Sequence, residues 1–435
     1  LEGGPQPRRD FSYTPSPAFG AEAGHRKIKM GACVVCSSQV EPFVSYGQQP
    51  IANGFLSPSQ FASEYFFELE LAFCPNCTMV QLTGQPEREK MFNENYAFFS
   101  GTSRHMSVHF ADFAESVRSQ YLQDADPFVV EIGSNDGIML KNFAARGVRH
   151  LGIEPSANVA EAARANGVNT LNRFFDAETA RLVVAENGHA DAFLAANVMC
   201  HIPYLHSVIE GIKVLLKPNG VVAFEDPYLG DVVEKTSYDQ IYDEHMFLFS
   251  VSSIEQLFGG HGMELIDVVP QPTHGGSMRY ILAKKGARPS TPRVAAQKQI
   301  EQDQGLTKLE TFHQFRKNCE KSRQDLRTLL ANLKAQNKRV VGYAATSKST
   351  TVLNYCQIGP DLIEYISDST PIKQGKFSPG MHIPIVAPEV FRSAPPDFAV
   401  LFGWNHKKEI LENEKTFTAN GGKWIMFVPE VGALP

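Results

Sequence analysis

The chain has 435 residues, enough for two or three domains that each bury a hydrophobic core. Hydrophobic residues make up 43% of it and charged residues 20%, as in ordinary soluble globular proteins. The net charge of −6 leaves no basic excess to neutralise phosphates, so we expect no nucleic-acid partner. Because there is neither a membrane-length apolar run nor an apolar signal-peptide core, we expect a cytoplasmic protein without a membrane partner. We also expect a monomer.

Two Cys-x-x-Cys pairs follow a leader rich in Pro, Gly and Arg. The leader, residues 1–29, shows no periodicity, and we interpret it as a disordered extension or a cloning remnant. The paired cysteines are Cys33, Cys36, Cys74 and Cys77. In a large chain such pairs are more often metal ligands than disulfides, and four thiolates suit a structural Zn²⁺ with no open position for water. We predict a zinc-binding β subdomain over residues 30–90; two turns with incidental thiols are the alternative.

A strand, a glycine turn and a helical pattern open the central part of the chain. Residues 128–132 read Phe-Val-Val-Glu-Ile and are followed by Gly-Ser-Asn-Asp-Gly. This pattern is typical of a nucleotide-binding βαβ unit, in which glycine lets the backbone approach a ligand. The G-x-G-x-x-G of a dinucleotide fold is missing, so a pyrophosphate has little to bind. An acid that could hold two ribose hydroxyls follows about twenty residues later, as Glu154 at the end of the next strand.

The acid before the turn and the turn itself resemble motif I of class I methyltransferases, whose ligand is S-adenosylmethionine. Strands predicted at 128–132, 150–154, 169–171, 191–196, 220–225, 264–268 and 279–284 alternate with helices such as 156–166 and 206–216. We therefore predict a Rossmann-like cofactor domain over residues 91–290. Its expected cofactor-binding residues are Glu131, Gly133, Asn135, Gly137, Glu154, Pro155, Phe174, Phe175 and Asn197. The two phenylalanines either line an adenine site or belong to the core.

A cluster of ionisable side chains follows the strand at 220–225. Tyr242, Glu244 and His245 supply a hydroxyl donor, an acid and a base within four residues, at the sheet edge where ligands bind in α/β folds. The alternative is a solvated loop. His274 lies in another polar turn that could close over the same site. Residues 91–103, which combine aromatic and polar side chains, are predicted to line a wet cavity.

A second α/β unit follows a Pro-, Ala- and Arg-rich stretch, residues 286–297, which we interpret as a linker. Apolar residues at helical spacing then predict one long amphipathic helix, so that residues 291–435 form a linker helix and a C-terminal domain. Its first turn reads G-x-x-x-x-S-K-S, which lacks the glycine that a P-loop needs before the lysine. We reject an NTPase and predict that the helix start, with Thr346, Ser347 and Lys348, binds a phosphate-bearing group.

Taken together, the motifs resemble those of sugar C-methyltransferases, in the same order. The shared motifs are the two C-x-x-C pairs, E-I-G-S-N-D-G, C-H-I-P, F-E-D-P-Y-L-G-D, Y-D-E-H, H-G-G and G-Y-A-A-T-S-K-S. The resemblance extends from about Ala32 to the C-terminus. It implies S-adenosylmethionine-dependent methylation at C-3 of a dTDP-linked 4-keto-6-deoxysugar. The same chemistry at C-5 or on a GDP-linked sugar, a zinc-containing RNA methyltransferase and a non-catalytic nucleotide-binding module are the alternatives.

The resemblance also implies roles for single residues. His245 would remove the proton next to the ketone; Tyr96, Tyr242 and Glu244 would position the sugar and stabilise the enolate oxygen; and His201 would lie nearby. The first α/β domain would hold the cofactor and the second the nucleotide-diphosphate sugar. Expected substrate-binding residues are Thr346, Ser347, Lys348, His274 and Asn405.

Overall fold

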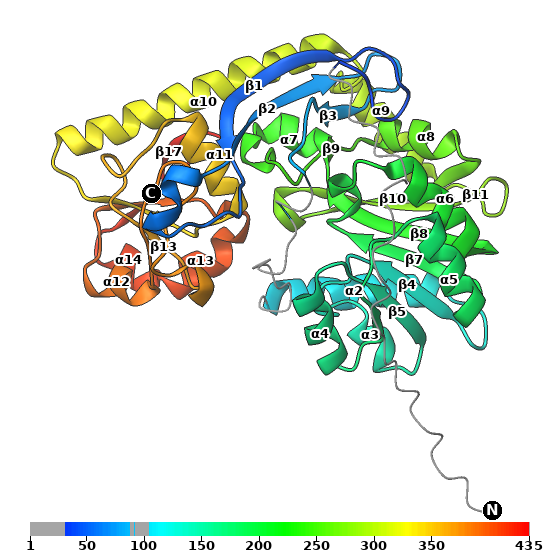
Figure 1. The fold of residues 1–435 in the computed structure, drawn as a ribbon. Helices are drawn as coiled ribbons and strands as arrows, with labels where there is room; N and C mark the ends of the chain where they lie inside the picture. The colour runs from blue at the N-terminus through cyan, green and yellow to red at the C-terminus, as the bar shows by residue number, and fades with distance from the viewer. Residues whose placement is uncertain (1–30, 88–90, 92–103, 435) are drawn as a thin grey trace, which may run out of the picture.

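The computed structural model describes residues 31–87, 91 and 104–434, which form three sheets (Figure 1). Two predictions concern segments outside the described residues: the leader 1–29 and the loop that contains Tyr96. Within the described part of the chain, no helix has both the length and the apolar character needed to cross a bilayer. The predicted α/β architecture with an N-terminal β subdomain is confirmed.

The N-terminal subdomain is a four-stranded sheet. Three of its strands, β1 (Glu41–Pro50), β2 (Phe66–Phe73) and β3 (Val80–Leu82), are antiparallel neighbours in this order. The fourth strand, β9 (Phe247–Leu248), comes from the central part of the chain and pairs with β3. Because β9 begins two residues after His245, the N-terminal sheet is joined directly to the Tyr242–His245 segment.

The central domain contains a seven-stranded sheet of order β10-β11-β8-β7-β4-β5-β6. Its strands are β4 (Phe128–Ile132), β5 (Arg149–Ile153), β6 (Thr170–Leu171), β7 (Ala190–Ala196), β8 (Leu216–Pro227), β10 (Met263–Gln271) and β11 (Ser277–Lys284). β11 runs in the opposite direction to the other six strands of this sheet. β4 is buried at every position, as expected for a parallel strand covered by helices on both faces. The helices of this domain are α2 (Arg104–Tyr121), α3 (Lys141–Ala144), α4 (Ala157–Ala165), α5 (Ala177–Asn187), α6 (Leu205–Leu215), α7 (Leu229–Lys235) and α8 (Val251–Gly259).

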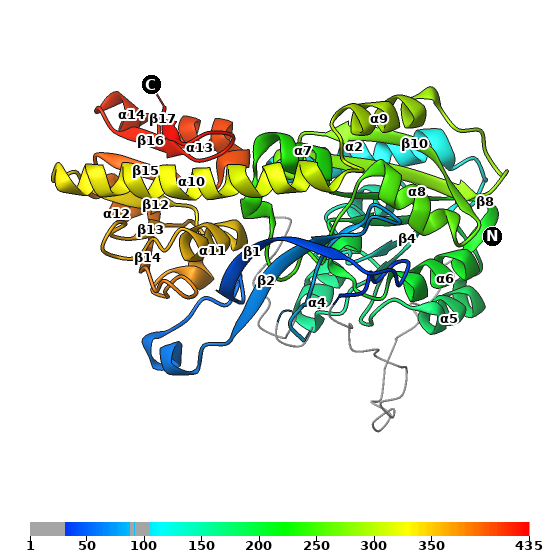
Figure 2. The ribbon, with the colours of Figure 1, turned by 90° about the horizontal axis from the view of Figure 1, so that it is seen from above.

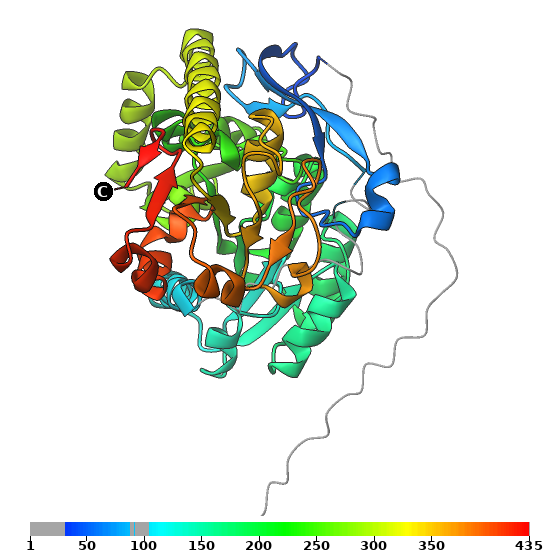
Figure 3. The ribbon, with the colours of Figure 1, turned by 90° about the vertical axis from the view of Figure 1, so that its left-hand side faces the viewer.

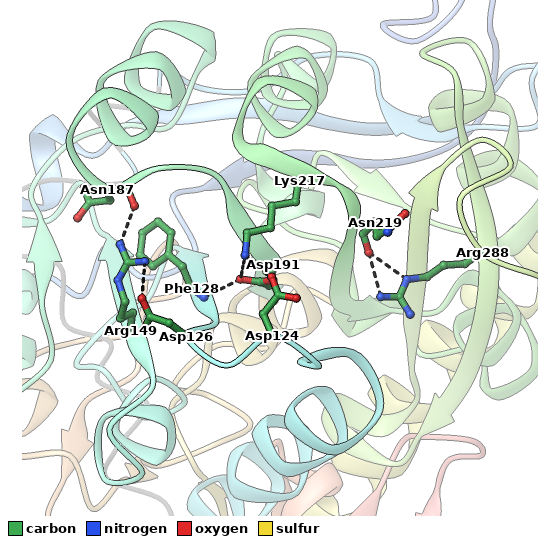
Figure 4. A network of polar contacts seen from close by, with 9 residues as sticks. All are labelled: Asp124, Asp126, Phe128, Arg149, Asn187, Asp191, Lys217, Asn219 and Arg288. Atoms are coloured by element: carbon green, nitrogen blue, oxygen red, sulfur yellow. Dashed lines mark hydrogen bonds and ion pairs between the residues drawn. The ribbon is translucent and has the colours of Figure 1, made fainter.

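A polar network fastens the amino-terminal ends of the central strands (Figure 4). Asp191, next to the start of β7, accepts a hydrogen bond of 2.7 Å from the backbone N–H of Phe128, at the start of β4. Lys217 at the start of β8 lies 2.8 Å from Asp191 and 2.6 Å from Asp124. These contacts hold three strand starts in register, which leaves the opposite, carboxyl ends of the strands to carry the ligand site.

The linker predicted at residues 286–297 is wrong in its second half, because Pro292–Asp303 form helix α9. Pro292 occupies the first helical turn, where a missing N–H costs nothing. Glu301 on this helix is fully buried, and its carboxylate accepts hydrogen bonds from the backbone N–H groups of Val251 (2.6 Å) and Ser252 (2.9 Å) at the start of α8. A weakly amphipathic helix is therefore stabilised by a tertiary contact that no local sequence pattern reveals.

The predicted long helix is α10 (Leu309–Ala335), which leads into the C-terminal domain (Figures 1 and 2). Phe312 on α10 packs against Phe43 of β1 with ring centroids 5.0 Å apart. The C-terminal sheet has six strands in the order β14-β13-β12-β15-β16-β17, and its domain lies at the front in Figure 3. Its elements are β12 (Val340–Tyr343), α11 (Ser347–Tyr355), β13 (Ile366–Ser367), β14 (Ile385–Val386), α12 (Pro388–Ser393), β15 (Phe398–Leu401), α13 (Lys407–Asn413), α14 (Lys415–Ala419), β16 (Lys423–Met426) and β17 (Gly432–Ala433).

Candidate functional site

The four paired cysteines come together as two knuckles of the same geometry. In each knuckle the residue after the second cysteine has a left-handed backbone, Ser37 at φ 63° and Thr78 at φ 59°, and its N–H donates to the carbonyl of the first cysteine. The sulfur atoms lie within 4.8 Å of one another, with Cys33–Cys77 at 3.5 Å and Cys36–Cys74 at 3.4 Å. Tetrahedral Zn–S bonds of about 2.3 Å place sulfurs about 3.8 Å apart, so the donors fit zinc.

One cavity of about 410 Å³ gathers most of the predicted site residues. It is lined by residues from the carboxyl ends of the central strands, from α11 and the β15–α13 turn, and from two N-terminal loops. The predicted residues that line it are Gly133, Asn135, Glu154, Pro155, Phe174, Phe175, Asn197, His201, Tyr242, Glu244, His274, Thr346, Ser347, Lys348 and Asn405. Of the predicted residues that the structure describes outside the zinc cluster, Glu131, Gly137 and His245 lie outside this lining. Segments far apart in the sequence thus form one site.

One end of the cavity is built by the glycine turn and the tip of β5. The Glu154 carboxylate accepts hydrogen bonds from the backbone N–H groups of Ser156 (2.9 Å) and Asn135 (3.1 Å), which fixes it in the cavity wall. Gly133 has φ 56°, and a Cβ there would lie 2.4 Å from the Val198 side chain. The turn therefore requires glycine, and the fixed acid keeps lone pairs available for a diol such as a ribose.

Glu131 and Gly137 belong to the same strand and turn but lie outside the cavity lining, so their contact with the cofactor stays a prediction. Glu131 is buried within β4, where desolvation and the neighbouring charge of Glu154 raise the pKa of its carboxyl well above the usual value. Gly137 has φ 80°, and a Cβ there would lie 2.7 Å from Val168. Its role in the turn is conformational.

The two phenylalanines differ. Phe175 is 4% exposed and packs against Phe193 of the core with ring centroids 5.3 Å apart, whereas Phe174 is 38% exposed. Both line the cavity. Phe174 is thus the more exposed of the two, and Phe175 belongs to the core as well as to the cavity wall.

Tyr242 and His245 form a hydrogen-bonded pair at the cavity wall. Nδ1 of His245 lies 2.6 Å from the carbonyl oxygen of Gln240, which only accepts, so Nδ1 carries the hydrogen. Nε2 therefore has the lone pair and accepts the Tyr242 hydroxyl at 2.8 Å. Burial, and next the nearby His201, lower the pKa of His245 well below its usual value, so the ring is neutral at neutral pH. Tyr242 faces the cavity and His245 lies behind it.

His201 and Glu244 flank this pair. The ring of His201 lies 5.2 Å from that of His245, and burial lowers its pKa to about 4, so it too is neutral. The Glu244 carboxylate accepts a hydrogen bond of 2.7 Å from the amide of Asn53, in the loop after β1. The wall thus presents a phenol and an oriented carboxylate beside one another, and the acceptor nitrogen of His245 lies behind the phenol.

The C-terminal wall differs from a simple phosphate cradle. At the start of α11, Thr346 and Ser349 form a capping box, and the Ser347 hydroxyl donates to Asn53 at 3.1 Å. These hydroxyls are engaged within the protein, which leaves Lys348 as the main charged group at this wall. Burial lowers the pKa of Lys348 to about 8, opposed by the nearby charge of Asp239, and its Nζ donates to the His274 carbonyl at 3.1 Å.

Six further polar residues that line the cavity were missed by the sequence analysis. They are Asn53, Gln85, Ser156, Arg173, Tyr204 and His406. Asn53-Gly54 is a dipeptide typical of turns, so the sequence marks a loop there but does not indicate where the loop leads. Gln85 donates to the backbone carbonyl of Asp243 at 3.0 Å. The N-terminal subdomain thus contributes to the site, although its composition suggested only a metal-held scaffold.

Fold and site define a methyltransferase with a Cys₄ subdomain and a second α/β domain. Family models match three consecutive regions: a zinc binding domain over 33–92, a methyltransferase domain over 104–268, and a C-methyltransferase C-terminal domain over 272–429. The C-methyltransferase NovU of Streptomyces niveus is 34% identical over 390 residues, covering 89% of this chain and 92% of the relative. The chain belongs to the C-methyltransferase family. Its cofactor is S-adenosylmethionine, and its metal is a structural zinc ion.

Two of the similar solved structures each cover less than half of this chain. A methyltransferase from Anabaena variabilis is 17% identical with a TM-score of 0.33, covering 41% of this chain and 86% of its own. Magnesium protoporphyrin IX methyltransferase from Synechocystis, solved with bound S-adenosylmethionine, is 14% identical with a TM-score of 0.31, covering 41% and 81%.

Proposed function

We propose that this enzyme methylates C-3 of a nucleotide-linked, dTDP-bound 4-keto-6-deoxysugar by removing the proton next to the ketone. The observation that carries the proposal is the Tyr242–His245 pair, whose Nε2 lone pair points at a hydroxyl on the wall of the cofactor cavity. NovU, a C-methyltransferase related over most of the chain, supports a carbon acceptor. The nucleotide and the attacked carbon follow from the motif resemblance.

The energetics explain why several groups must converge. A carbon beside a ketone is a weaker acid than imidazolium by on the order of ten pKa units, or about 14 kcal/mol. A single oxyanion donor supplies only about 3–4 kcal/mol. The enolate oxygen at C-4 therefore needs more than one donor in a cavity with little water. Once Nε2 of His245 is protonated, it donates to the Tyr242 oxygen, and the Tyr242 hydroxyl then donates to the enolate. Tyr96, which lies outside the described residues, is proposed as another donor.

His245 is the proposed final acceptor of the proton. Burial lowers the pKa of His245 and so weakens it as a base. The negative charge of the forming enolate stabilises the imidazolium and raises this pKa during proton transfer. Because Tyr242 stands between His245 and the cavity, the proton reaches Nε2 through the Tyr242 hydroxyl or after Tyr242 swings aside. Glu244 and His201 then orient the sugar hydroxyls.

S-adenosylmethionine supplies an electrophilic methyl group, which needs only in-line proximity to the carbanion. Glu154 is proposed to hold the ribose of this cofactor, and the Gly133 turn is proposed to lie against the cofactor. Asn135, Pro155, Asn197 and Phe174 are proposed to surround it. Lys348, Asn405 and His274 are proposed to face the nucleotide diphosphate of the substrate, with Thr346 and Ser347 shaping the wall. Attack at C-5 and a GDP-linked sugar are the variants of this proposal.

The direct test is incubation with S-adenosylmethionine and a panel of dTDP- and GDP-linked 4-ketosugars, followed by mass spectrometry and carbon NMR. We expect one methylene to be gained at C-3 of a dTDP-linked substrate. Gain at C-5 or on the GDP series would change the substrate assignment. Tight binding of the sugars without any methyl transfer would favour a non-catalytic nucleotide-binding module.

A further inference from the structure

The loop after β1 enters the active-site cavity from the zinc subdomain. β1 and β2 form a long hairpin that reaches across to the C-terminal domain (Figures 1 and 2). Within the loop, the N–H of Ala52 donates to the Asp243 carboxylate at 2.9 Å, and its carbonyl accepts from the Thr350 hydroxyl at 2.9 Å. Ala52 is thus held between the central domain and the C-terminal domain, which fixes the position of the next residue, Asn53.

The Asn53 side chain joins all three units. Its amide nitrogen donates to the Glu244 carboxylate at 2.7 Å, and its amide oxygen accepts from the Ser347 hydroxyl at 3.1 Å. The NH₂ of an amide only donates, so it must face an acceptor oxygen, here Oε1 of Glu244. This contact lies at the cavity wall.

We propose that Asn53 is a positioning residue for catalysis, whose amide holds the Glu244 carboxylate in its working orientation beside the Tyr242–His245 pair. This inference rests on the proposed C-methylation, in which Glu244 orients the sugar. The inference gives the zinc subdomain a part in the reaction. Its β1–β2 hairpin carries Asn53, whose amide orients the Glu244 carboxylate. Ser347 couples the same amide to the C-terminal domain.

Two variants separate positioning from a general loss of folding. Asn53→Ala removes the donor and is expected to lower kcat by about 10- to 100-fold at every pH, because a misplaced group costs about that much. Asn53→Asp places a second carboxyl against Glu244. It is expected to keep turnover at acidic pH, where the two carboxyls share a proton, and to lose it as rising pH ionises both.

Gln48→Glu is the matched control. Gln48 lies on the same hairpin, is exposed, and donates through its amide to the Glu68 carboxylate at 3.0 Å. This variant also replaces a side-chain amide that faces a glutamate by a carboxyl, but it lies away from the cavity. The kcat of Gln48→Glu should therefore follow the wild-type pH profile. A wild-type profile for Asn53→Asp, or wild-type kcat for Asn53→Ala, would overturn the inference.

Failure of the proposed function gives a different result. In that case the wild type and Gln48→Glu methylate none of the 4-ketosugars. The inference is then decided without turnover, by titrating the ¹³C-labelled carboxyl of Glu244, assigned with Glu244→Gln. If Asn53 contacts Glu244, the signal titrates at higher pH in Asn53→Asp than in wild type. An unchanged titration would remove the proposed role.

Discussion

The hydroxyl of Tyr242 lies 2.8 Å from Nε2 of His245, and the other ring nitrogen is held 2.6 Å from the Gln240 carbonyl. This fixes both the tautomer and the ring orientation of His245. The imidazole presents its basic nitrogen toward the cavity, but only through Tyr242. The phenol and the imidazole are therefore expected to act as one unit.

Tyr242→Phe tests this unit. Removing the hydroxyl takes away an enolate donor and the hydrogen-bonded path to His245, so we expect turnover to fall by about 10²-fold or more. Tyr343→Phe is the control, because its hydroxyl donates to Glu414 in the C-terminal domain, away from the cavity. Near wild-type turnover of Tyr242→Phe would mean that His245 reaches the substrate without it.

The zinc is expected to hold the N-terminal fold. Metal analysis should find one zinc ion per chain. Cys74→Ser should give insoluble or unfolded protein, because a small sheet joined to the catalytic segment through β9 loses its metal. Cys319→Ala, at a buried thiol of α10 away from the knuckles, should keep the zinc. Soluble, active Cys74→Ser protein without metal would contradict a structural role.

Glu154 is expected to determine cofactor affinity. Glu154→Ala removes the carboxylate held by Ser156 and Asn135, and should weaken S-adenosylmethionine binding by about 1.5–3 kcal/mol through lost charge-assisted hydrogen bonds. Calorimetry gives the value directly. Glu161→Ala, on the exposed face of α4, should bind like wild type. Equal affinity of Glu154→Ala and wild type, or a preference for NAD, would refute the ribose assignment.

The pKa of Lys348, about 8, predicts a pH effect on substrate capture. The ammonium form, present below that pH, attracts a diphosphate, and the neutral form above it does not. We expect kcat/KM, which reports the free enzyme, to fall above about pH 8. Lys348→Met should lower kcat/KM and abolish this alkaline decrease, whereas Lys423→Met, at an exposed position on β16, should keep it. If kcat/KM of Lys348→Met still falls above about pH 8, the decrease comes from the titration of another group, and the assignment to Lys348 is wrong.

The sequence predicted the positions of the central strands because β4, β7 and most of β8 are buried apolar runs. Motif spacing also predicted that Glu154, Tyr242 and Glu244 lie near one another, because the carboxyl ends of parallel strands meet at one edge of a sheet. All three line the same cavity. The sequence did not predict α9, whose stability depends on the tertiary contact of Glu301 with α8. Asn53 and Gln85 were missed because their place in the site depends on how the zinc subdomain docks, and no local pattern records docking.

The Tyr242–His245 segment also shows a limit of motif reasoning. The sequence places a phenol and an imidazole three residues apart, but only the structure shows which of them faces the cavity. The order matters chemically, because the residue that faces the substrate and the residue that finally holds the proton need not be the same.

Proton exchange is the most direct test of His245 as the base. In D₂O, with a 4-ketosugar substrate and S-adenosylhomocysteine in place of the methyl donor, wild type should incorporate deuterium at the carbon next to the ketone. His245→Asn keeps the shape and some hydrogen bonding but cannot accept the proton, so it should bind both ligands and not exchange. Its turnover should fall by about 10²- to 10⁴-fold. Exchange in His245→Asn as fast as in wild type would contradict the account and leave Glu244 or His201 as the base.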